Sequence, residues 1–111
     1  MPLANGPTIV APIAGQVLAE AVFPTPRHIR VIVMLTATYN FEAILEVWNA
    51  AGQVIQDVVL SIAAPIWDSE ELGPFVVPAN GRVRVISRGT PVTPGTLEVQ
   101  ASLFWRDWGE R

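Results

Sequence analysis

Residues 28–48 read HIRVIVMLTATYNFEAILEVW, and a hydrophobic side chain occupies every second position of this run. Successive side chains of a β-strand point to opposite faces of a sheet, so a two-residue period predicts strands with one buried face. The run is longer than an ordinary strand, and we expect a turn near Tyr39 and Asn40 to divide it in two. The apolar positions are Ile29, Val31, Val33, Leu35, Ala37, Tyr39, Phe41, Ala43, Leu45 and Val47.

Alternating runs continue on both sides of this segment. The turn residues 49–52 separate it from residues 53–62, which we expect to fold back on residues 41–48 as a hairpin. No segment shows a helical period over ten residues. The pattern predicts an all-β, antiparallel β-sandwich of seven to nine short strands, with a jelly roll as one candidate topology. Besides those named above, the expected strands are 8–11, 15–23, 65–67, 75–77, 82–88 and 97–105.

The first fourteen residues differ in composition from the rest. They contain Pro2, Pro7 and Pro12, and proline cannot donate a hydrogen bond to a sheet, so this segment belongs at an edge or outside the fold. We therefore expect an extended N-terminal arm over residues 1–14. Residues 15–111 have the length of a single sandwich domain.

The composition excludes several classes of function. Of the 111 residues, 50% are hydrophobic, 15% are charged and none is cysteine, and the net charge is −3. An acidic chain is a poor match for nucleic acid, which selects basic surfaces. No apolar stretch approaches the roughly 20 residues that cross a bilayer, and we expect neither a membrane partner nor a signal peptide. Such an apolar composition favours a protein whose surface is partly covered by protein partners.

The residues that could carry chemistry do not form a catalytic motif. His28 is the only histidine, and no serine lies in a glycine-flanked nucleophile motif. Asp68, Glu70 and Glu71 are the densest carboxylate group, but a calcium loop usually supplies more ligands than three. We expect no enzyme activity, no catalytic residue, no cofactor and no metal site.

Arginine and tryptophan, which are favoured in protein interfaces, gather near the carboxyl end. We take six residues as a candidate subunit interface, although a solvated strand face and, for Trp105, core packing are simpler interpretations. In an oligomer, an acidic face formed by Glu42, Glu46 and Asp57 would pair with the basic face of the strand at 82–88 in another subunit. The six candidates are Arg82, Arg84, Arg88, Trp105, Arg106 and Trp108.

An exposed indole ring can also stack on a sugar, which gives a second hypothesis. Trp48 has the same parity as Glu42 and Glu46, which predicts that it lies outside the core. Trp67 precedes the acidic loop, and core packing is its simpler interpretation. These two residues are the candidate sugar-stacking positions of a carbohydrate-binding module or a receptor-binding domain.

The last third of the chain resembles a known group of proteins. Residues 75–85 (FVVPANGRVRV), a proline- and glycine-containing loop and the strand at 96–103 (TLEVQASL) are similar in turn chemistry and strand order to small β-sandwich virion proteins of tailed bacteriophages. The resemblance implies a capsid decoration or accessory virion protein, located on the capsid surface. It also implies a homo-oligomer, typically a trimer, whose N-terminal arm contacts a major capsid protein.

The leading hypothesis is therefore a non-enzymatic structural protein that self-associates and binds other protein subunits. The alternative is carbohydrate or receptor binding through exposed tryptophans. Neither hypothesis calls for a cofactor.

Overall fold

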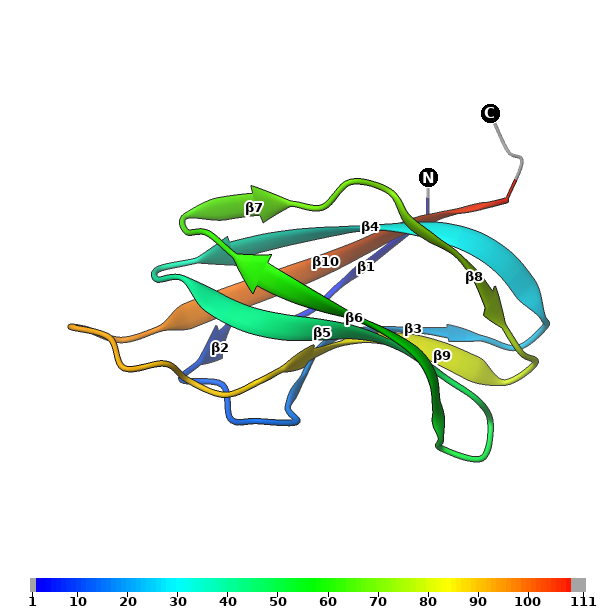
Figure 1. The fold of residues 1–111 in the computed structure, drawn as a ribbon, viewed down its shortest axis with the longest axis horizontal. Coiled ribbons are helices and arrows are strands. Elements are labelled where there is room, and N and C mark those ends of the chain that lie inside the picture. Colours follow the sequence, from blue (N-terminus) through cyan, green and yellow to red (C-terminus); the bar gives the residue numbers. More distant parts are fainter. Residues whose placement is uncertain (1, 109–111) are drawn as a thin grey trace.

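The computed structural model describes residues 2–108; Met1 of the predicted arm and residues 109–111 of the predicted domain lie outside the described part. Within it, ten strands form two antiparallel sheets that pack face to face (Figure 1). Sheet A contains β1 (Leu3–Asn5), β2 (Ile9–Val10), β4 (Arg27–Ala37), β7 (Ile66–Asp68), β8 (Leu72–Val77) and β10 (Glu98–Asp107). Sheet B contains β3 (Val17–Phe23), β5 (Phe41–Trp48), β6 (Val54–Ile62) and β9 (Gly81–Ser87).

The predicted antiparallel β-sandwich is confirmed, and the strand order identifies its topology. Sheet A has the order β1-β10-β4-β7, with β2 beside β10 and β8 beside β4, and sheet B has the order β3-β9-β5-β6. Between β3 and β10 the chain crosses repeatedly from one sheet to the other, as in a jelly roll. The ten strands exceed the expected seven to nine because β1, three residues within the predicted arm, was not expected to form a strand.

The run at residues 28–48 is divided where the sequence predicted, and the two halves belong to different sheets. Residues 38–40 connect β4 in sheet A to β5 in sheet B. The Thr38 hydroxyl donates to the Thr96 carbonyl (2.9 Å) and accepts from the Glu98 N–H (2.9 Å). The Asn40 side-chain oxygen accepts from the Ala64 N–H (2.8 Å). These hydrogen bonds hold the connection in place between the two sheets. One alternating run therefore supplies a strand to each layer of the core.

The core lies between the sheets and follows the predicted parity. Along β4 the residues Ile29, Val31, Val33 and Leu35 are fully buried, whereas their neighbours on the other parity are partly or fully exposed. The hairpin of β5 and β6 is also confirmed, with paired residues running from Phe41 opposite Ile62 to Val47 opposite Gln56. Burial of branched apolar side chains from both sheets is the main stabilising contribution in such a sandwich.

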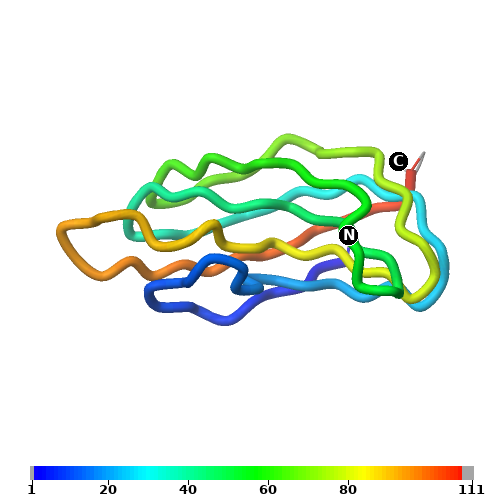
Figure 2. Tube along the Cα trace, turned by 60° about the horizontal axis from the view of Figure 1, so that its bottom comes forward, coloured from blue at the N-terminus to red at the C-terminus, as the bar shows by residue number. Residues whose placement is uncertain are grey.

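The segment predicted as an arm is extended and pairs with sheet A. β1 lies antiparallel to β10, with Leu3 opposite Phe104, and β2 pairs with the same strand. Figure 2 shows this N-terminal segment, in dark blue, next to β10 and β3. Between β1 and β2, the N–H of Gly6 donates to the Ala101 carbonyl (2.8 Å). Gly6 is buried, and a Cβ atom at this position would lie 1.7 Å from the Leu18 carbonyl oxygen in sheet B.

We expect Gly6→Ala to destabilise the sandwich by about 1–3 kcal/mol, the usual cost of inserting an atom into a packed site. The clash involves the backbone of Leu18, which no side-chain rotation relieves. Chemical denaturation followed by tryptophan fluorescence measures the change. Thr8→Ala, at an exposed position in the same segment, is the control and should leave the midpoint almost unchanged. Equal midpoints for the two variants would show that the N-terminal segment does not pack as described.

Candidate functional site

The outer face of sheet B, the face turned away from the core, carries a row of apolar side chains across all four strands. Val17 of β3 is opposite Ile86 of β9, Ile86 is opposite Ile44 of β5, and Ile44 is opposite Val59 of β6. Only 7% of Ile86 is exposed although it lies outside the core cluster, because its neighbours on this face surround it. These four residues are referred to below as the apolar row.

A second row on the same face is charged. It runs from Glu20 through Arg84 and Glu46 to Asp57, again one residue from each strand. The Arg84 guanidinium binds the Glu20 carboxylate, and Arg82 lies 3.8 Å from the same carboxylate. Glu20 is thus shared by both arginines of β9, and the carboxylates of Glu46 and Asp57 bring the charge of this face close to balance.

Trp48 lies on this face, outside the core, as its parity predicted. The Arg84 guanidinium is 4.9 Å from the centre of the indole ring, within the range of a cation–π contact. The Trp48 Nε1 is buried and has no hydrogen-bond partner among the described residues. A shallow depression of about 480 Å³ adjoins the indole, lined by Trp48, Ile44, Glu46, Arg84 and Arg88 among others.

Trp67 and Trp105 pack against the core. Trp67 is opposite the fully buried Leu35, so its side chain lies on the inner face of sheet A. Trp105 contacts Phe23 of sheet B edge to face, with ring centres 5.4 Å apart. The indoles of Trp67 and Trp105 are half-buried and close the gap between the layers. The two candidate sugar-stacking residues are therefore not brought together, because Trp67 faces the core and Trp48 lies on the outer face of sheet B.

Arg106 and Trp108 lie on the outer face of sheet A, where they meet the acidic loop. Arg106 donates two hydrogen bonds to Glu71 (2.6 and 2.8 Å), and Arg30 donates a third (3.2 Å). The Arg106 hydrogen bonds, followed by that from Arg30, lower the pKa of Glu71 from 4.5 to about 2. The Trp108 ring stacks on His28 and lies under the Arg30 guanidinium, 4.3 Å away.

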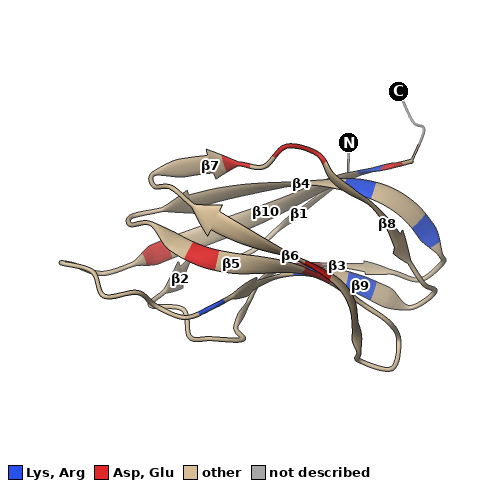
Figure 3. Cartoon of the chain, in the orientation of Figure 1, with Lys and Arg blue, Asp and Glu red and all other residues tan. Residues whose placement is uncertain are grey.

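The six candidate interface residues therefore occupy three separate places. Arg82, Arg84 and Arg88 follow the outer face of sheet B, Trp105 closes the core, and Arg106 and Trp108 belong to sheet A. Glu42, one of the three acidic residues expected to pair across subunits, lies 3.7 Å from Arg88 of its own chain. Figure 3 shows acidic and basic positions scattered over the strands, without a continuous stripe of one sign.

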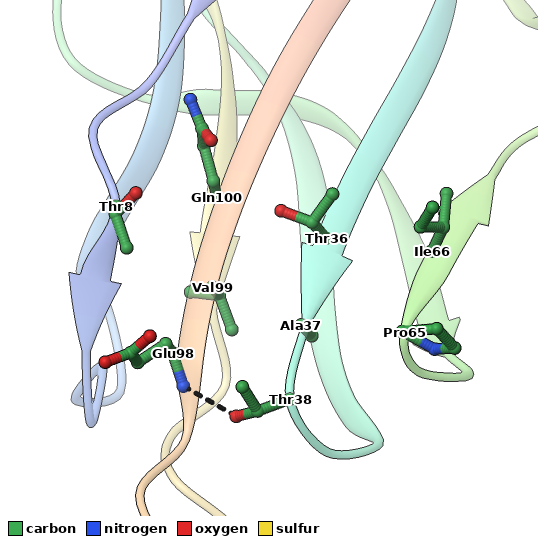
Figure 4. A pocket seen from close by; sticks show the side chains of 9 residues that line it. All are labelled: Thr8, Thr36, Ala37, Thr38, Pro65, Ile66, Glu98, Val99 and Gln100. Carbon is green, nitrogen blue, oxygen red and sulfur yellow. Dashed lines mark hydrogen bonds between the residues drawn. The ribbon is translucent and has the colours of Figure 1, made fainter.

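Another depression, of about 370 Å³, lies at the end of sheet A (Figure 4). Its polar side chains are Thr8, Thr36, Thr38, Glu98 and Gln100. The Glu98 N–H in this wall donates to the Thr38 hydroxyl. No group of three histidine, aspartate or glutamate side chains in residues 2–108 is close enough together to hold a metal ion. No helix in the same residues is long and apolar enough to span a membrane.

Sequence reasoning missed the apolar row. Val17, Ile44, Val59 and Ile86 come from four segments, and Ile44 and Ile86 are apolar residues among charged neighbours of the same parity. Val17 has the apolar parity of its strand in the sequence, and the bulge between Val17 and Ala19 moves it to the outer face. The available signal was weak, because isolated apolar residues on exposed positions are ordinary. Only the register of β3, β9, β5 and β6 aligns them.

We expect the Glu71 ion pairs to make stability depend on pH. The folded pKa of about 2 is below the ordinary value of 4.5, so the stabilisation is complete above about pH 4.5 and is lost as the pH falls toward 2. Glu71→Gln should lower the melting temperature at pH 7, and its difference from the wild type should shrink below pH 4.5. Glu70→Gln, which removes a neighbouring exposed charge, is the control for circular dichroism melts. A constant difference from pH 7 to pH 2 would contradict the assignment.

Comparison with known proteins gives a fold and no family. No family model matches the chain, and no curated protein matches it. A solved structure described as "CBM4 structure and function" is similar to it, with a TM-score of 0.60 and 9% sequence identity over 95% of this chain and 94% of that chain. At so low an identity the similarity shows a shared β-sandwich fold.

Proposed function

We propose that this protein is a non-enzymatic structural β-sandwich that associates with copies of itself and with other protein subunits through the outer face of sheet B. The apolar row carries the proposal. It places Val17, Ile86, Ile44 and Val59 side by side on the face that the core does not use. Covering aligned apolar side chains lowers the free energy in proportion to the area removed from water.

The charged groups around the apolar row support the same proposal. Arg84 and Arg82 pair with Glu20, and Arg88 pairs with Glu42, so a partner would meet a nearly neutral face. The cores of protein interfaces are depleted in unpaired charge and enriched in tryptophan and arginine. Trp48 with Arg84 packed on its ring fits that composition.

We place this function in a virion, as a capsid decoration or accessory protein on the capsid surface, with a homo-oligomer as the expected form and a major capsid protein as the partner. This setting is supported by the resemblance of residues 75–103 to bacteriophage virion proteins and by the apolar composition. Residues 3–10, by contrast, pair within the chain's own sheet A, so sheet B is the surface we assign to the partner.

Light scattering coupled to size exclusion tests the proposal. The wild type should form a discrete oligomer, and Ile44→Lys should raise its dissociation constant by about tenfold or more, because it places a charge in the centre of the covered row. Met34→Lys is the matched control, because Met34 is an apolar residue on the outer face of sheet A, also in a central strand. It should leave the oligomer intact.

A wild type that stays monomeric at every soluble concentration would contradict the proposed self-association. Equal weakening by Ile44→Lys and Met34→Lys would contradict the assignment to sheet B. Melting temperatures of both variants show whether either substitution unfolds the chain instead.

Carbohydrate or receptor binding is the second candidate, and Trp48 is the residue that favours it. The depression beside its indole, with Glu46 and Arg88 in the wall, supplies donors and acceptors of the kind that hold a sugar. The structure with the same fold is described as a CBM4, a carbohydrate-binding module.

Glycan binding measured by calorimetry separates the two candidates. If the second is correct, Trp48→Ala should abolish binding and the accompanying change in tryptophan fluorescence. Trp108→Ala, which removes an exposed tryptophan near sheet A, should retain both. An absence of binding across an array of oligosaccharides would eliminate this candidate.

A further inference from the structure

Three of the four sheet edges carry features that discourage pairing with another strand. In sheet A, one edge consists of β1 and β2, which are very short and separated by Pro7, and the other consists of β7 and β8, which are interrupted and contain Pro74. In sheet B, β3 has a bulge between Val17 and Ala19. Short strands, prolines and bulges are the devices by which proteins prevent edge-to-edge association.

The fourth edge, β6, has none of these features along most of its length. It spans nine residues without proline, glycine or a basic residue, and its pairing with β5 is regular from Gln56 to Ile62. Asp57 is its single charge. No strand in the described residues pairs with its outer side, and in Figure 1 the β5–β6 hairpin extends beyond the sandwich at its turn.

The hydrogen-bond pattern of sheet B determines which backbone N–H and C=O groups of β6 point outward. The Arg88 N–H donates to the Glu42 carbonyl, so even-numbered residues of β5 bond toward β9 and odd-numbered ones toward β6. The odd-numbered residues of β5 are paired with even-numbered residues of β6. Asp57, Val59 and Ser61 therefore direct their N–H and C=O groups outward, and their side chains lie on the outer face of sheet B.

We propose that β6 pairs antiparallel with β6 of a second copy of this chain, with Val59 of each copy at the two-fold axis, joining two B sheets into one of eight strands. The inference rests on the proposed self-association and adds to it a contact at the edge of sheet B, which joins two copies where the resemblance to virion proteins implies three. In this register Asp57 faces Ser61 of the second copy, and Leu60 faces Val58 of the second copy. The occupant is a second copy because the strand is complementary to itself.

The composition of β6 selects this register over its neighbours. Centring the pair on Asp57 would place two carboxylates opposite each other, which destabilises a sheet. Centring it on Val58 would place Asp57 opposite Val59, so that a charge would meet an apolar side chain. Centring it on Val59 places the two Val59 side chains opposite each other and gives the Asp57 carboxylate the Ser61 hydroxyl as a donor. Asp57, Val59 and Ser61 of each copy still form backbone hydrogen bonds with the other copy.

The two rows of the outer face become continuous in the same register. The apolar row of one copy ends at Val59 and would meet Val59 of the other, so one apolar row would cross all eight strands. Asp57 is opposite Glu46 within its own chain, an unfavourable like-charge neighbour. The Ser61 hydroxyl of the second copy would offset part of that repulsion.

Amide hydrogen exchange by NMR tests the pairing directly. At high protein concentration the amides of Asp57, Val59 and Ser61 should exchange about tenfold or more slowly than after dilution below the dissociation constant. The amide of Val58, which bonds within the chain, should be far less sensitive to dilution. Association through the face of sheet B alone would leave the three outward amides unprotected.

Single cysteines test the register, since the chain contains no cysteine. Val59→Cys should oxidise to a disulfide-linked dimer, because directly opposed residues of an antiparallel pair lie within disulfide range. Val22→Cys is the matched control, on the other edge strand of sheet B with the same exposed fraction, 55%, and should remain monomeric under the same oxidation.

The results separate this inference from the proposed function. An oligomer whose three outward amides exchange equally fast at both concentrations, and in which Val59→Cys does not cross-link, would overturn the β6 pairing and leave self-association standing. A monomeric wild type would overturn both. Protection of the three amides together with cross-linking at position 59 would establish the pairing.

Discussion

The fold depends on the single hydrophobic core that β4 and β5 share from opposite sheets. Both strands come from one alternating run, and both turn their apolar parity inward although they lie in opposite sheets. This is possible because residues 38–40 carry the chain across the sandwich, held by the hydrogen bonds of Thr38 and Asn40. The other strands extend these two central ones, β10 and β8 beside β4, and β9 and β6 beside β5.

The inner faces of both sheets form the core, so the outer faces, the edges and the loops are the parts that meet the surroundings. On sheet B the outer side chains form transverse rows, one apolar and one charged, because residues that are opposite in an antiparallel sheet lie on the same face. The charged row holds one arginine and three carboxylates, and Arg82 and Arg88 on the same face bring the face close to neutral. The face combines an apolar row, an arginine-covered tryptophan and a low net charge, a combination typical of surfaces that bind other proteins.

The sheet edges limit how such a molecule can assemble. A protein with exposed apolar rows aggregates if its edges also accept strands without restriction. Here short strands, prolines and a bulge interrupt three edges, and β6 is left regular over most of its length. One unprotected edge with a self-complementary sequence gives a closed pair of chains, whereas two would permit an open chain of subunits.

The sequence by itself determined the fold class, the parity of the core strands, the division near Tyr39, the β5–β6 hairpin and the outward position of Trp48. All of these follow from local alternation and turn chemistry, which act between residues that are close in the chain. It also favoured core packing for Trp67 and Trp105, which the structure confirms. It did not determine that Glu71 lies between Arg30 and Arg106, or that the first residues pair with β10. Each of these depends on strand order and register, which bring together residues far apart in the sequence. For the same physical reason only the tertiary structure could align Val17, Ile86, Ile44 and Val59 into one row and leave β6 as the unprotected edge.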